Sequence, residues 1–392
     1  MRGLRGLTAA VCVAAAAAIL SSCSSTQFNQ LGTSPAAAPP PQPQATIGTG
    51  KIRVGLILPL SAPGNAGVAA QSMKNAAQMA LDEFKNPNIQ LLVKDDAGNP
   101  QSAQAAAQQA LNEGAEIIVG PLFAQAVRAV GTVTRQHNVP VIAFSTDSSV
   151  ASPGVYLLSF LPETDVKRIV DYQIGRGRRS FAALLPDNAY GSVAQAAFQQ
   201  EVSRRGGRIL AIEKYSNNPA SLAQAAKRVA QVARRVDSLF IPDNGDSVAK
   251  VAQALTADRV NLHRLQLLGT GLWEDQAVFS DKLLQGGLYA APQTTGFRNF
   301  AKRYRARFGQ EPVRTATLSY DAVALIAALV KTQGVQRFSP QILTNQSGFA
   351  GIDGIFRFRR DGTNDRGLAV MRVTPSGGQV VSPSPSSFKP GT

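Results

Sequence analysis

Short apolar runs rich in β-branched residues alternate with alanine-rich stretches through the first half of the chain. The run 52–58 predicts a strand, and the stretch 66–84 predicts a helix because its apolar residues recur at spacings of three and four. Further strands are expected at 89–93, 116–119 and 139–144, and further helices at 102–113 and 124–136.

The same alternation repeats in the second half of the chain. Strands are expected at 181–185, 208–212, 238–241 and 265–268, and helices at 192–205, 221–234, 247–255, 297–308 and 315–331. The end differs, because Asp353-Gly354 and Asp361-Gly362 are turn signals between alternating strands. Near-continuous apolar strands between helices predict parallel sheets covered on both faces. The expected fold class is α/β, with two doubly wound parallel-sheet lobes, an interlobe cleft and a terminal antiparallel addition.

The N-terminal segment has the organisation of an export signal. Arg2 and Arg5 precede an apolar run at 7–20, which is too short to span a membrane as a helix. The run ends in Leu20-Ser21-Ser22-Cys23, a pattern that resembles the bacterial lipobox. We therefore expect residues 1–22 to be a signal peptide and Cys23 to carry lipid. The alternative is an ordinary signal peptide with an incidental cysteine.

Two further segments lack the apolar residues that a core needs. Residues 23–50 are rich in Pro, Ala and Gln and predict an extended tether, and residues 375–392 predict a disordered tail. The only other cysteine, Cys12, lies in the signal peptide, so the mature protein has no disulfide. Ser24 instead of Asp follows the lipidated cysteine, which favours the outer membrane over the inner one.

The net charge of +15 is spread along the chain, with small clusters at 176–179 and 357–360. An envelope location excludes nucleic acid as the partner, so this basic surface would face solvent or anionic envelope components.

Ligands bind outside the carboxyl ends of parallel strands, which directs attention to six polar loops. These are 59–67, 120–125, 145–149, 186–191, 242–247 and 269–275. Their Ser, Thr, Asn, Asp and aromatic side chains suit a small polar ligand. The candidate binding residues are Ser61, Phe123, Ser145, Thr146, Tyr190, Asn244, Asp246, Trp273 and Glu274. Packing within the second lobe is an alternative role for Trp273, and turn capping is one for Asn244 and Asp246.

The sequence offers no support for catalysis or for a cofactor. The two histidines, His137 and His263, lie far apart, so no metal site is expected. Gly48-Thr49-Gly50-Lys51 lacks the spacing of a phosphate loop and precedes its strand. Asp95-Asp96 is interpreted as a turn at the end of a strand. No Gly-x-Ser-x-Gly motif is present, so we do not expect an enzyme.

Several loop sequences together resemble a known family. Val54–Ser61, 94–100, 118–121, 139–142, Asn188–Gly191 and Ser319–Ala322 are similar to segments of type I periplasmic solute-binding proteins of the leucine/isoleucine/valine-binding class. The resemblance implies two lobes joined by three hinge crossings that close on a ligand. It places residues 51–163 with 289–337 in lobe 1, and 164–288 with 338–374 in lobe 2.

The resemblance also bears on the site residues. Thr146 and Tyr190 match the threonine and tyrosine of amino-acid binders. Ala124 stands where many members have Ser or Thr, and Gly271 stands where the ammonium-binding Glu is found. Glu274 and Asp243 are the nearby acidic substitutes.

A second branch of the same fold is similar at Gly120–Phe123 and Tyr156–Phe160, namely the lipoproteins described as activators of penicillin-binding proteins. The leading hypothesis is a lipid-anchored solute-binding protein that serves an ABC permease and binds amino acids or a related small polar solute. The alternative is a periplasm-facing lipoprotein that activates a penicillin-binding protein by contact.

Overall fold

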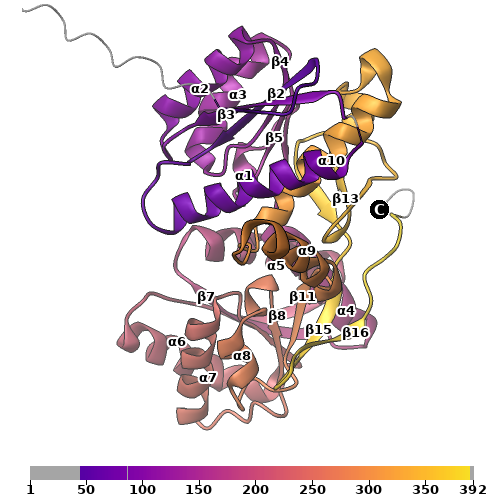
Figure 1. Cartoon of the computed structure of the whole chain (residues 1–392). Coiled ribbons are helices and arrows are strands. Elements are labelled where there is room, and N and C mark those ends of the chain that lie inside the picture. The colour runs from indigo at the N-terminus through magenta and orange to yellow at the C-terminus, as the bar shows by residue number, and fades with distance from the viewer. Residues whose placement is uncertain (1–44, 86, 389–392) are drawn as a thin grey trace, which may run out of the picture. The chain divides into compact units, whose positions relative to one another are not determined.

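The computed structural model describes residues 45–85 and 87–388. Cys23, the signal peptide and most of the predicted tether lie outside these residues. The described residues all belong to one compact unit, and the description below concerns that unit alone. Within it are two lobes, each built on its own sheet (Figure 1).

Lobe 1 contains a six-stranded sheet with the order β1-β3-β2-β4-β5-β6. Apart from the short antiparallel edge strand β1, the neighbouring strands pair in parallel, as predicted. Its strands are β1 (Thr46–Ile47), β2 (Ile52–Leu58), β3 (Ile89–Asp95), β4 (Ala115–Val119), β5 (Val141–Ala143) and β6 (Val155–Leu157). Its helices are α1 (Asn65–Glu83), α2 (Pro100–Asn112), α3 (Ala124–Gln136), α9 (Thr294–Phe308), α10 (Ala316–Thr332) and α11 (Pro340–Leu343).

Helices cover both faces of this sheet. On one face α1 and α10 lie side by side and bury Met73, Leu318 and Ile326 against the strands (Figure 1). On the other face α2 and α3 contribute Ala107, Val127 and similar small apolar residues. This two-sided burial explains why the central strands contain almost only apolar residues.

Lobe 2 contains a seven-stranded sheet with the order β16-β15-β11-β10-β9-β7-β8. Strands β7 to β11 are parallel, and β15 and β16 add to them in antiparallel fashion. The strands are β7 (Ser180–Pro186), β8 (Arg208–Tyr215), β9 (Ser238–Phe240), β10 (Gln266–Gly269), β11 (Leu288–Ala291), β15 (Ala369–Thr374) and β16 (Gly377–Ser382). The helices are α4 (Pro162–Gly175), α5 (Ala189–Arg204), α6 (Pro219–Val232), α7 (Gly245–Ala257) and α8 (Gln276–Ser280).

A third, small sheet consists of β12 (Phe349–Gly351), β13 (Gly354–Phe358) and β14 (Asn364–Arg366). The two predicted turn signals lie between these strands. The sheet packs on lobe 1, because Phe356 and Phe358 are buried in the lobe 1 core together with Leu343.

These contacts correct the predicted domain boundaries. The sequence places residues 338–358 in lobe 2, but in the structure their apolar side chains pack in the lobe 1 core. Residues 288–291 form β11 inside the lobe 2 sheet, so the crossing there follows Ala291 instead of preceding it. The prediction of a disordered tail at 375–392 is wrong through Ser382, because β16 pairs with β15 and shields its edge.

Asparagine side chains start several helices directly after strands. Asn99 caps α2 by accepting the N–H of Ser102, and Asn218 caps α6 by accepting the N–H of Ala220. Each is followed by proline at the first helical position, where a missing N–H costs nothing. These caps fix short turns at the carboxyl ends of the strands, where the candidate residues lie.

Three chain segments cross between the lobes, after β6, after β11 and after β14. The first and third crossings are bonded to each other. The side-chain amide of Asn364 donates to the carbonyl oxygens of Leu157, at 2.7 Å, and Ser159, at 2.9 Å. Nε of Arg366 donates to the same Ser159 oxygen at 3.0 Å.

Candidate functional site

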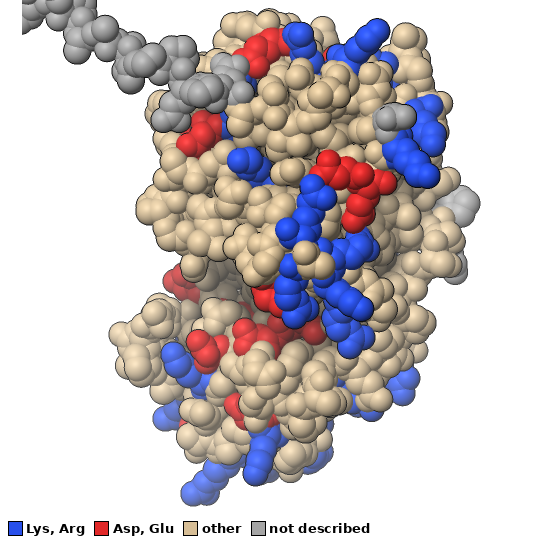
Figure 2. Space-filling model, in the orientation of Figure 1, with Lys and Arg blue, Asp and Glu red and all other residues tan. Residues whose placement is uncertain are grey.

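The candidate residues fall into two groups, each at the carboxyl edge of one sheet. Those of lobe 1 follow β2, β4 and β5, and those of lobe 2 follow β7, β9 and β10. Figure 2 shows a hollow on one face of the protein with acidic side chains around it and a group of basic side chains beside it.

In lobe 1, the four candidates differ in how much surface they offer. Ser61 and Thr146 are exposed, whereas Ser145 is buried and its Oγ accepts the N–H of Asp147 at 3.1 Å. Phe123, at the start of α3, keeps 38% of its surface exposed, which is unusual for a phenylalanine. Ser61 donates its N–H to Asp95 at 3.2 Å. Burial acts to raise the pKa of Asp95, but hydrogen bonds from Ser61 and Ala97 outweigh it and lower that pKa.

In lobe 2, Tyr190 lies in the first turn of α5, which the Asn188 side chain caps. Its hydroxyl donates to Oγ1 of Thr270 at 2.9 Å. Burial raises the pKa of Tyr190, and the nearby carboxylate of Asp165 raises it further. The phenol therefore stays neutral and serves as a hydrogen-bonding group.

Trp273 is fully buried, and its indole N–H donates to the carbonyl of Ile241 at 3.0 Å. A Cβ at Gly269 would lie 2.2 Å from the ring, so only glycine permits this close approach. The ring has no exposed face for a ligand. The packing role, which the sequence left open, accounts for its position.

The remaining lobe 2 candidates have identifiable local partners. Asn244 accepts the N–H of Ser247 at 3.2 Å and so caps α7, which is the capping role considered above. Asp246 is exposed in the first turn of the same helix. The carboxylate of Glu274 accepts a hydrogen bond from the Tyr289 hydroxyl. Burial raises the pKa of Glu274, while the charges of Arg314 and Arg298 act to lower it.

The structure adds a carboxylate that the sequence analysis missed. Asp165 lies in the first turn of α4 and is 7% exposed. Its Oδ2 accepts the N–H of Gly271 at 2.8 Å, and a Cβ at residue 271 would lie 3.4 Å from the same oxygen. Burial raises the pKa of Asp165 to about 7, although the Gly271 N–H and the charge of Arg366 oppose this. A carboxylate thus lies beside Gly271, the position at which the sequence itself has no acidic side chain.

Two arginines and an aromatic ring meet at the crossings between the lobes. The guanidinium groups of Arg314 and Arg366 lie 4.8 and 4.7 Å from the centre of the Phe160 ring. Arg314 also makes a two-pronged ion pair with Asp353, at 2.9 and 2.6 Å. Arg366 is 6% exposed, and its Nη1 and Nη2 have no hydrogen-bond partner among the described residues.

Metal ligands and membrane-spanning helices can be considered for residues 45–85 and 87–388, the part of the chain that the structure describes. This part of the chain contains no group of three or more His, Cys, Asp or Glu side chains placed to hold a metal ion. It also contains no helix with the length and apolar character needed to cross a membrane.

Comparisons with known proteins agree with the geometry. A family model described as periplasmic binding protein matches residues 51–379. An ABC transporter substrate-binding protein from Sphaerobacter thermophilus has the same fold, with a TM-score of 0.69 at 20% identity over 86% of this chain and 98% of that one.

Two curated relatives match shorter regions. The Leu/Ile/Val-binding protein BraC3 of Rhizobium johnstonii is 29% identical over 104 residues, which are 25% of this chain and 28% of that protein. The penicillin-binding protein activator LpoA of Pantoea ananatis is 28% identical over 182 residues, which are 42% of this chain and 26% of that protein. The matched region spans less than half the length of each curated relative.

Proposed function

Because the chain belongs to the periplasmic binding protein family, we propose that it binds a small polar solute with a cationic group between its lobes and delivers it to an ABC importer. The family places the protein outside the cytoplasm. The observation that carries the proposal is the Asp165 carboxylate beside Gly271, with the Tyr190–Thr270 hydrogen bond nearby.

The charge requirement follows from desolvation. An amino-acid ammonium enclosed in a cleft needs a counter-charge, since an unpaired buried charge costs several kcal/mol or more. Asp165 supplies such a charge from α4, whereas a side chain at position 271 would have supplied it from the loop after β10. On lobe 1, Ser145, Thr146 and the backbone at the end of β5 provide hydrogen-bond donors for the carboxylate of the same ligand.

A thermal-shift screen of the twenty amino acids tests this proposal. For any amino acid that stabilises the protein, the matching amine should also bind, and the matching carboxylic acid without an ammonium should not. Ligand at a hundredfold excess over Kd stabilises the fold by about 2.7 kcal/mol, which is readily detected.

Asp165→Asn is the decisive variant, since an amide keeps the shape and can still accept the Gly271 N–H but lacks the charge. It should abolish the shift. Asp258→Asn is the matched control, because Asp258 is an exposed carboxylate beyond the far end of α7. A shift that survives in Asp165→Asn would exclude Asp165, and a blank screen would exclude amino acids.

The LpoA similarity supports a second candidate, activation of a penicillin-binding protein by direct contact. This candidate does not require an interlobe ligand. Surface plasmon resonance with the purified periplasmic part of a penicillin-binding protein from the same organism tests it. Specific binding together with a blank solute screen would favour the activator over the importer protein.

Membrane attachment through Cys23 is part of both candidates. Cys23→Ala should leave the N-terminus unacylated and move the protein from the membrane fraction to the soluble fraction. Mass spectrometry of the mature N-terminus provides the direct measurement, and a wild-type N-terminus without lipid would refute the anchor. Separation of the inner from the outer membrane, followed by detection of the protein in each fraction, tests the predicted outer-membrane location.

A further inference from the structure

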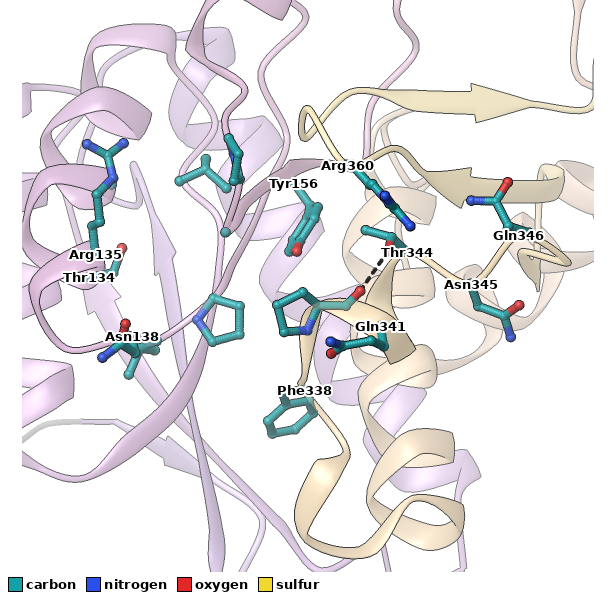
Figure 3. Close-up of a pocket in the computed structure, with 17 residues that line it drawn as sticks. Thr134, Arg135, Asn138, Tyr156, Phe338, Gln341, Thr344, Asn345, Gln346 and Arg360 are labelled. Carbon is teal, nitrogen blue, oxygen red and sulfur yellow. Dashed lines mark hydrogen bonds between the residues drawn. The ribbon is translucent and has the colours of Figure 1, made fainter. Parts of the chain in front are cut away.

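A cavity lies in lobe 1, at the opposite sheet edge from the interlobe residues. It has a volume of about 1070 Å³ and is bounded by the C-terminal half of α3, the amino ends of β5 and β6, and the segment around α11 (Figure 3). Small-molecule sites usually measure about 300–1000 Å³, so this cavity exceeds what a single amino acid would fill.

The cavity wall is amphipathic. Its apolar part includes Tyr156, Phe338 and Pro340, and its polar part consists of amide and hydroxyl side chains with two arginines, Arg135 and Arg360. None of its lining residues is an aspartate or a glutamate. This composition favours a ligand that has both an apolar body and a negative charge.

Arg360 provides the available positive charge. It ends the basic run 357–360, in which Arg357 and Arg359 both pair with Asp365. Arg360 makes no ion pair with a carboxylate in the part of the chain that the structure describes. Figure 3 shows its side chain extending toward Tyr156 and Thr344, whereas the guanidinium of Arg135 points away from them.

We propose that this cavity binds an amphipathic anion, that is, an acidic group on an apolar body larger than an amino-acid side chain. The acidic group is held by Arg360, and the apolar body lies against Tyr156, Phe338 and Pro340. This site is separate from the interlobe residues, so it does not depend on the solute-binding proposal.

Decanoate and decanol are suitable probes because they share an apolar chain and differ in charge. Isothermal titration calorimetry on the mature protein should show decanoate binding about tenfold more tightly than decanol, the contribution expected of one charge-assisted hydrogen bond. Arg360→Gln should remove this difference, and Phe338→Ala should weaken both probes. Arg372→Gln, which removes an equivalent exposed charge on β15, should change neither.

Two results would overturn the proposal: equal affinity for the two probes in the wild-type protein, or decanoate affinity that is unchanged in Arg360→Gln. Arg360 is exposed, so its substitution should leave the melting temperature unaltered.

Flotation with phosphatidylglycerol vesicles, performed on protein lacking the lipid anchor, distinguishes the source of the anion. Flotation that depends on Arg360 identifies a lipid, and decanoate binding without flotation identifies a free acid.

Discussion

Oδ2 of Asp165 accepts a hydrogen bond at 2.8 Å from the N–H of Gly271, a residue 106 positions further along the chain. The bond joins the first turn of α4 to the loop after β10 and holds a carboxylate where residue 271 itself has no side chain. An acidic side chain from another element thus lies beside a position that has no side chain of its own.

The pKa of Asp165 predicts how ligand binding depends on pH. Because that pKa is about 7, the carboxylate is mostly protonated at pH 6 and mostly ionised at pH 8. A cationic ligand should therefore bind more tightly as the pH rises, by up to about tenfold over this range. Calorimetric titrations with the amino acid found by screening, at pH 6, 7 and 8, provide the measurement. The Asp165→Asn variant should show no binding at any of these pH values, and a wild-type affinity that falls as the pH rises would contradict the assignment.

Protein stability should have the opposite dependence on pH. Burial raises the pKa of Asp321, like that of Asp165, from an ordinary 3.8 to about 7. Between the ordinary pKa and the raised pKa, the folded protein binds more protons than the unfolded chain. The free energy of unfolding should therefore fall as the pH rises from 5 to 7. Urea denaturation across this range is the test. Asp321→Asn should reduce the slope, and an unchanged slope would exclude Asp321 as its source.

Substitution of Trp273 should affect stability before it affects binding. Trp273→Ala should lower the free energy of unfolding by about 3–5 kcal/mol, because it leaves a large cavity in the lobe 2 core. Trp273→Phe should cost less, since it loses mainly the hydrogen bond to Ile241 and part of the ring. Urea denaturation followed by circular dichroism measures both. A ligand-induced thermal shift that disappears in a stably folded Trp273→Phe protein would restore a direct ligand contact for this residue.

Removal of β16 should destabilise lobe 2. A chain that ends at residue 376 loses the pairing with β15 and the hydrogen bond, 2.7 Å long, from Arg168 to the Ser382 hydroxyl. We expect a loss of about 2 kcal/mol or more in the free energy of unfolding. A chain that ends at residue 388 is the control, since it keeps every described strand. Equal stability of the two chains would show that β16 contributes nothing to the fold.

Regular elements with strong periodicity could be predicted from the sequence almost to the residue. The helix expected at 124–136 is α3, Ala124–Gln136, because its apolar positions follow the helical repeat without interruption. Strand β11 was missed because it is only four residues long and follows two glycines. Helix α4 was also missed, although Pro162 at its start and Glu163 and Asp165 in its first turn are typical of a helix N-terminus.

The candidate site could be predicted less completely than the fold. Strand ends are local features, so the loops that carry Thr146 and Tyr190 were found from the sequence. Whether a side chain in such a loop points outward or into the core depends on distant partners, as Trp273 shows with its bond to Ile241. The role of Asp165 depends on Gly271, and no local pattern connects two residues so far apart in the chain.

Each lobe is built from segments that are far apart in the sequence, and this has a consequence for folding. Helix α10 completes the core of lobe 1, and strands β15 and β16 complete the sheet of lobe 2. Neither lobe is a continuous stretch of chain, and each is completed by segments far along the sequence from its first strand. Contacts between such distant segments slow folding, because long loops must close before the contacts can form. A chain halted before residue 369 would therefore expose unfinished apolar surface on lobe 2, where a chaperone or a protease would act on it.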